Sequence, residues 1–185
     1  ARVVALARAA LAVALGHLGD LEPAKAAALD ALRAFTSHGD TRAEAITRAH
    51  FARLCDASGD AAGALREARA ASAALAPLPA AHAYALAVES RALGHRGDVD
   101  GALAAASRAS QILDRLGALA EGEAFVRLAH VEALIAAGRP ARPALDAAAR
   151  RLHERAARIE PPGARRAFLE RIVEHRRTLE LAARG

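Results

Sequence analysis

Several residue types are missing from this chain or nearly so. Its 185 residues include no methionine or tryptophan, one tyrosine and one cysteine, and aromatic residues make up 3% of the total. A single cysteine excludes an internal disulfide, so the architecture does not depend on oxidation. Residues 70–88 carry no formal charge, but Pro77 and Pro79 interrupt them. We therefore expect an interhelix loop in that stretch and no association with a membrane.

Alanine is the commonest residue at about 30% of the chain, and it has the highest helix propensity of all residues. Apolar residues recur at intervals of three and four positions, as they do in amphipathic helices, and no stretch alternates as a strand would. The sequence therefore predicts an all-α protein in which Leu, Ile, Val and the four Phe supply the larger core side chains.

A short pattern recurs four times along the chain. In the first copy, Gly19-Asp20 precedes Ala24, Ala28 and Ala31, and the second and third copies keep this arrangement. The fourth copy is weaker, as terminal units of repeat arrays often are. The glycines that mark the copies follow one another after 40, 38 and 41 residues: Gly19, Gly59, Gly97 and Gly138. Self-similarity at such a period indicates stacked supersecondary units.

Each unit is predicted to hold two helices, with the glycine ending the first and the aspartate capping the second. We expect helices over residues 3–18, 22–35, 41–57, 61–75, 81–96, 99–116, 118–137 and 143–158. The corresponding repeats are 1–40, 41–78, 79–117 and 118–160, and a basic C-terminal helix is predicted in 161–185.

This pattern resembles the tetratricopeptide repeat (TPR) family. In that family a small residue lies midway along the first helix, Gly-Asp or Gly-Asn closes it, and alanines recur through the second. Ala12, Ala52 and Ser90 match the small residue, whereas the consensus aromatic positions are mostly Ala or Leu here. The resemblance implies a right-handed α-solenoid of about four antiparallel helix pairs plus a C-terminal helical segment. It also implies a non-catalytic protein-protein interaction scaffold.

The last segment carries a second resemblance. Residues 166–182 are similar to segments that end the TPR regions of large bacterial signalling proteins, although Ile172-Val173-Glu174-His175 stands where those tails have Val-Pro-Glu-Asn. The resemblance implies the C-terminal part of a cytoplasmic multidomain regulator, and the start without methionine is expected for a piece of a longer chain. Without that proline, the segment 164–184 is open to being one helix or two.

The net charge of +5 is unevenly distributed. Residues 139–185 contain twelve Arg and six Asp or Glu, whereas residues 1–138 are nearly neutral. Such a segment is either a solvated face laced with helical ion pairs or an anionic docking surface. Phe168 is its only aromatic residue, and bases in single-stranded nucleic acid need rings on which to stack. Nucleic-acid binding through this segment is therefore a distant alternative.

The residues that could carry chemistry have structural explanations. His17 and His95 occupy the same place in the first and third repeats, too far apart along a stack to share a metal ion. Cys55 falls where the repeat requires a buried apolar residue. No nucleophile elbow, phosphate loop or clustered Cys/His pattern is present. We expect neither catalysis, nor a metal, nor a cofactor.

The TPR resemblance places a partner-binding groove on the inner surface formed by the first helix of each pair. Arg53 and Arg91 occupy equivalent positions in adjacent repeats, and two guanidinium groups there would bind an acidic protein or peptide. The alternatives are arginines that only solvate a polar face, and a structural self-association (homodimerisation) module. By position, the groove would be lined by His17, His50, Arg53, Asp56, Tyr84, Arg91, His95, Phe125 and Glu132.

Overall fold

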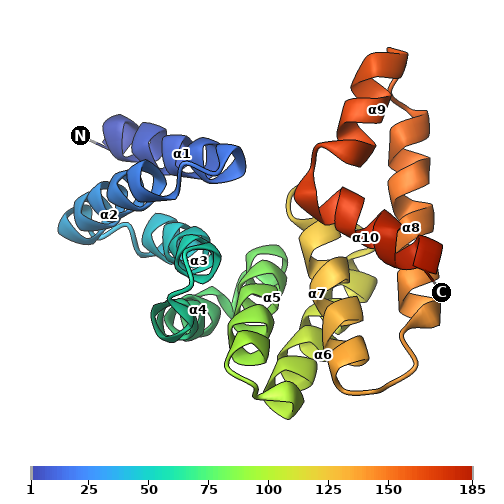
Figure 1. Ribbon diagram of the computed structural model, residues 1–185. Coiled ribbons are helices and arrows are strands. Elements are labelled where there is room, and N and C mark those ends of the chain that lie inside the picture. Colours follow the sequence, from blue (N-terminus) through green and yellow to red (C-terminus); the bar gives the residue numbers. More distant parts are fainter. Residues whose placement is uncertain (1, 185) are drawn as a thin grey trace.

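The computed structural model describes residues 2–184, and within them the regular structure is entirely helical. Figure 1 shows the helices following one another as a curved stack that ends in two crossing C-terminal helices. Residues 2–184 form ten helices: α1 (Arg2–Leu18), α2 (Leu21–His38), α3 (Thr41–Ala57), α4 (Ala61–Leu75), α5 (Pro79–His95), α6 (Val99–Leu116), α7 (Glu123–Ala136), α8 (Arg142–Ala157), α9 (Pro162–Glu170) and α10 (Val173–Arg184).

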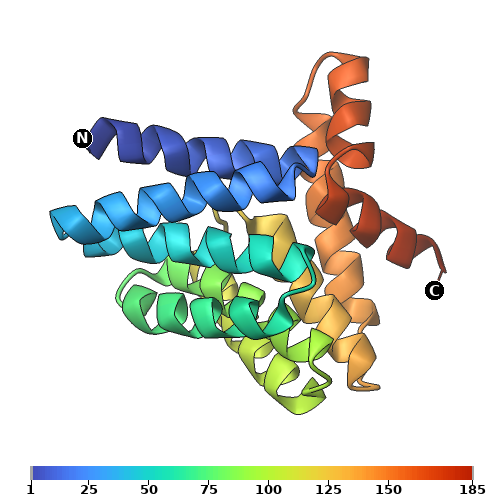
Figure 2. The same ribbon diagram turned by 60° about the vertical axis from the view of Figure 1, so that its left-hand side comes forward.

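The helices pair along the chain as the repeat predicts. Helices α1 and α2, α3 and α4, and α5 and α6 form antiparallel pairs, and each pair packs on the next. Figure 2 shows the first pairs as parallel layers, with α8 and the last helices crossing one end of the stack. The prediction of an all-α solenoid is confirmed. None of the described helices is long and apolar enough to cross a membrane.

Alanine side chains form the contacts between these layers. The repeated alanines of α2, α4 and α6 are all at most 2% exposed. A methyl group is the smallest side chain that buries apolar surface, so helices that meet at alanines approach closely. The buried set comprises Ala24, Ala28, Ala31, Ala64, Ala68, Ala71, Ala102, Ala106 and Ala109.

The turns between paired helices follow the sequence pattern. All four repeated glycines adopt a positive φ, between 62° and 87°, a conformation that other residues rarely take. The aspartate that follows caps the second helix in two repeats: Asp60 and Asp98 accept from the backbone N–H groups of Gly63 and Gly101 at 2.8 and 2.9 Å. Asp40, which lies between the first and second pairs, caps α3 in the same way and accepts from the N–H of Ala43 at 3.1 Å. Asp20 makes no such side-chain bond to α2.

The predicted start of one helix was wrong. The helix predicted over 118–137 begins only at Glu123, because residues 117–122 form a loop. Gly122 in that loop has a φ of 74°, and a side chain there would meet the Tyr84 ring at 2.6 Å. The C-terminal segment 164–184, which the sequence left open as one helix or two, is two helices, α9 and α10, within the described residues.

The break between α9 and α10 occurs without a proline. In an uninterrupted helix the carbonyl oxygen of Phe168 would accept from the backbone N–H of Ile172. Instead, the Nδ1 atom of His175 lies 2.7 Å from that oxygen. The imidazole of His175 also packs on the ring of Phe168, with their centroids 4.4 Å apart. The His175 side chain therefore takes the place of a helical hydrogen bond and turns α10 away from α9.

Replacing Asp98 by alanine is expected to destabilise the fold by about 1 kcal/mol, because the first turn of α6 loses its cap. Asp20→Ala is the matched control, since Asp20 occupies the same position in the first repeat without making the bond. Urea unfolding of both variants measures the difference. Equal losses would contradict a capping role for the Asp98 side chain.

Candidate functional site

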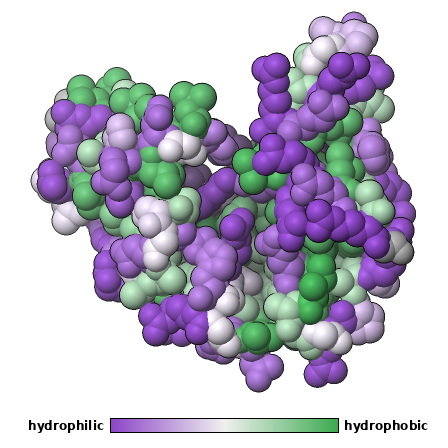
Figure 3. All heavy atoms as spheres, in the orientation of Figure 1, coloured by the Kyte–Doolittle hydropathy of each residue, from purple (hydrophilic) through white to green (hydrophobic). Residues whose placement is uncertain are grey.

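A pocket of about 390 Å³ lies on the inner side of the stack, between α1, α3, α5 and the first turn of α10. In Figure 3 the surface is hollowed between the first repeats and the C-terminal helices. Six of the nine side chains predicted for the groove line it together: His17, His50, Arg53, Asp56, Arg91 and His95.

The other three predicted residues lie outside this pocket. Phe125 is 3% exposed, and it supports the pocket arginines from beneath: the guanidinium carbons of Arg53 and Arg91 lie 4.9 and 5.5 Å from the centre of its ring. The Tyr84 ring packs between Phe125 and His50, with centroid distances of 5.3 and 5.0 Å. Glu132, on α7, lies 3.5 Å from Arg177 of α10.

Arg53 has a partner that the sequence did not indicate. Its guanidinium group forms an ion pair with Glu174 of α10, and the carboxylate side chain is only 7% exposed. The hydroxyl of Tyr84 lies 3.5 Å from the same guanidinium group. Burial works to lower the pKa of Arg53, but Tyr84 and Glu174 outweigh it and raise the pKa. Arg53 therefore stays charged, and its guanidinium group is fixed by Glu174 and Tyr84 of the same chain.

Among the pocket residues that the sequence did not indicate, Val173 and Glu174 come from the C-terminal segment. They lie in the first turn of α10, and Glu174 follows Arg53 by 121 positions. The repeat pattern contains no signal for this contact, because the tail lies outside the repeats. Glu174 itself matches the glutamate of the Val-Pro-Glu-Asn pattern, so nothing in the sequence marked it as a partner of Arg53.

Arg91 and His95 of α5 hold the Asp56 carboxylate of α3. The Nδ1 atom of His95 lies 2.6 Å from one carboxylate oxygen, and the Nε atom of Arg91 lies 3.7 Å from the other. The Asp56 side chain is 6% exposed, whereas those of Arg91 and His95 are 30% and 52% exposed. These two side chains consequently tie adjacent repeats together and still present their outer edges to the pocket.

His50 stays neutral at the base of the pocket. Burial, followed by the nearby positive charge of Arg53, lowers its pKa to about 4. Its Nδ1 atom lies 3.3 Å from the hydroxyl of Tyr84, whose own pKa is raised by burial. At neutral pH the pocket therefore combines two ion pairs, Arg53 with Glu174 and Arg91 with Asp56, around an uncharged imidazole.

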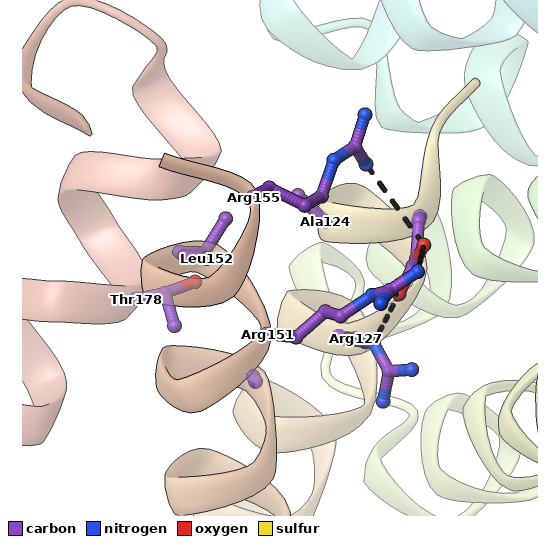
Figure 4. Close-up of a pocket in the computed structure, with 8 residues that line it drawn as sticks. Ala124, Arg127, Arg151, Leu152, Arg155 and Thr178 are labelled. Atoms are coloured by element: carbon purple, nitrogen blue, oxygen red, sulfur yellow. Dashed lines mark hydrogen bonds and ion pairs between the residues drawn. The ribbon is translucent and has the colours of Figure 1, made fainter. Parts of the chain in front are cut away.

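A second charged cluster lies between α7, α8 and α10 (Figure 4). Glu123 is 2% exposed, and its carboxylate lies 3.0 Å from Arg127, 2.9 Å from Arg151 and 3.9 Å from Arg155. Burial favours the protonated acid, but hydrogen bonds from Arg151 and Arg127 outweigh it and lower the pKa of Glu123. This ionised carboxylate fastens α8 to α7 at the end of the stack.

Five of the twelve arginines of the basic C-terminal region take part in ion pairs within the chain. Besides Arg151 and Arg155, Arg142 pairs with Asp146, Arg176 with Glu180 and Arg177 with Glu132. These contacts favour the interpretation of the region as a solvated face laced with ion pairs.

Residues 2–184 contain no group of three His, Cys, Asp or Glu side chains that could hold a metal ion. Burial raises the pKa of the Cys55 thiol to about 11. Since the thiolate is the nucleophilic form, Cys55 is unreactive at neutral pH.

No family model and no curated protein matches the chain. Among solved structures, two of a Podosopora anserina putative kinesin light chain with nearly identical TPR-like repeats are similar, one of them a point variant. Both have a TM-score of 0.63 at 15% identity, and the match covers 96% of this chain and 88% and 87% of theirs. At that identity the likeness shows the fold alone: this chain has a TPR-like helical repeat fold.

His50 is expected to make stability depend on pH. The pKa of His50 is about 4 in the folded protein, below the ordinary 6.5. Between pH 6.5 and pH 4 the unfolded protein therefore takes up a proton at this residue that the folded protein does not bind. The free energy of unfolding is consequently unaffected by the titration of His50 above pH 6.5 and decreases as the pH falls towards 4. The loss reaches about 2–3 kcal/mol. Urea unfolding between pH 7 and pH 4 should show a shallower decline for His50→Gln than for the wild type. His153→Gln, which changes an exposed side chain of α8, should follow the wild type.

Glu123→Gln is expected to destabilise the protein by about 3 kcal/mol, because three arginines then face one another without a carboxylate. The control is Glu154→Gln, which changes a half-exposed partner of Arg151 and should cost less than about 0.5 kcal/mol. Chemical denaturation of both variants provides the comparison. Similar losses would show that the Glu123 cluster does not fasten α8 to α7.

Proposed function

We propose that this protein is a non-catalytic interaction scaffold that binds a segment of a protein partner in the pocket between α1, α3, α5 and α10. The TPR-like fold supports an interaction scaffold in general. The observation that carries the specific proposal is the convergence of side chains from three successive repeats on one hollow of about 390 Å³. A pocket of that size accepts one or two side chains of an extended or helical segment.

The charges of the pocket define the partner that fits. Arg53 is occupied by Glu174, so it is not the first point of contact for an acidic residue. Arg91 lies at the longer distance of 3.7 Å from Asp56, and its neighbour His95 is half-exposed. An incoming carboxylate would receive hydrogen bonds from Arg91 and His95, while the apolar part of the segment packs on Val13 and Leu21. The partner is therefore an acidic peptide or protein segment with adjacent apolar residues.

The resemblance of the tail to bacterial signalling proteins supports a cytoplasmic regulatory setting. In that setting the bound segment belongs either to a separate protein or to another domain of the same polypeptide. The pocket chemistry is the same in both cases, because the pocket recognises a short stretch of chain.

A phage-displayed library of random peptides tests the proposal. The protein should enrich acidic-apolar sequences, and Arg91→Glu should weaken the selected peptides by at least about tenfold through loss of a charged hydrogen bond and added repulsion. Arg33→Glu is the matched control, because this arginine of α2 is 74% exposed and lies away from the pocket. Unchanged affinity for a correctly folded Arg91→Glu variant would exclude this pocket as the binding site.

A further inference from the structure

Helix α1 exposes a continuous apolar face on the side away from the stack. Its largest members are Val3, Val4, Leu11 and Leu18, which are 78%, 54%, 51% and 76% exposed. Ala7, Ala10 and Ala14 are also exposed and fall on the same side, because all seven residues recur at intervals of three and four. Figure 3 shows hydrophobic side chains gathered over α1. These seven residues are called the α1 face below.

In the next repeat, the equivalent face of α3 packs against α2. With the repeat step of 40 residues, Val3 corresponds to Ala43 and Leu11 to Phe51. Ala43 packs against Ala31 and Phe35 of α2, and Phe51 packs in the cluster that contains Ala24 and Ala28. The α1 face is therefore a stacking surface, and within residues 2–184 no helix covers it.

Both arginines of α1 form ion pairs with acidic residues of the stack. Arg2 lies 2.8 Å from Asp40, and Arg8 lies 3.7 Å from Asp30. Asp and Glu are absent from α1. The α1 face consequently has no charge with which to attract a nucleic acid or an acidic peptide, and only another apolar surface complements it.

We propose that the α1 face binds the α1 face of a second copy of this chain, with the two helices antiparallel about a two-fold axis near Leu11. The spacing supports this arrangement, because Val4 and Leu18 both lie seven residues from Leu11. Across the two-fold axis, Val4 of one copy therefore meets Leu18 of the other. The alanines between them permit a close approach of the two helices. The peptide pocket lies on the inner surface, so self-association and peptide binding are independent.

Sedimentation equilibrium of the full chain tests self-association. The wild type should sediment as a dimer of twice 19.1 kDa. Leu11→Glu should weaken association by at least about a hundredfold, because each dimer would bury two unpaired charges. Ile135→Glu is a matched control, since Ile135 on α7 is 48% exposed and distant in the stack; this variant should remain a dimer. A wild type that is monomeric at every concentration would overturn the proposal.

Cysteine cross-linking tests the antiparallel arrangement separately. Leu11→Cys should form a disulfide with its own copy, because the two-fold axis brings both residues together. Val4→Cys and Leu18→Cys should cross-link only when the two variants are mixed. Cys55 does not interfere, because it is 4% exposed and its thiol pKa is about 11. Efficient cross-linking of Val4→Cys with itself would show a parallel pair and overturn the proposed geometry.

Discussion

The ion pair between Arg53 and Glu174 fixes how the repeat stack and the C-terminal segment lie together. Arg53 belongs to the second repeat and Glu174 to the last helix, so the contact closes a loop of 121 residues. The arginine is supported by the ring face of Phe125 and by the hydroxyl of Tyr84, and these two residues come from two further repeats. One side of the pocket exists because α10 is held there. The inner surface of the solenoid is consequently a pocket bounded on one side by α10, where a bare stack would present an open groove.

Small side chains account for the other properties of the stack. Alanine contacts bring neighbouring helix pairs close together, so each repeat depends on its neighbours for burial. The same dependence leaves a stacking surface at α1, where the described chain provides no neighbour. The inner pocket and the outer α1 face therefore both result from the stacking of helix pairs. Their chemistry differs, because the pocket contains ion pairs whereas the α1 face consists of uncharged apolar side chains.

The sequence predicted those parts of the molecule that repeat. Helices α4 and α6 have the predicted bounds, because glycine, aspartate and alanine at fixed spacing determine local structure. Six of the residues predicted for the groove lie together around one pocket for the same reason. Residues 118–122 were predicted to be helical and are not, because Gly122 must make room for Tyr84, a residue of another repeat. The Arg53–Glu174 contact was also missed, since no local pattern indicates a pair so distant along the chain.

A double-mutant cycle on Arg53 and Glu174 tests this account most directly. The free energy of unfolding would be measured by urea denaturation for the wild type, Arg53→Ala, Glu174→Ala and the double variant. If the pair holds α10 against the stack, the two substitutions should be coupled by about 1–3 kcal/mol. Losses that add within about 0.5 kcal/mol would contradict the account, because the tail would then not be bound at the pocket through this pair.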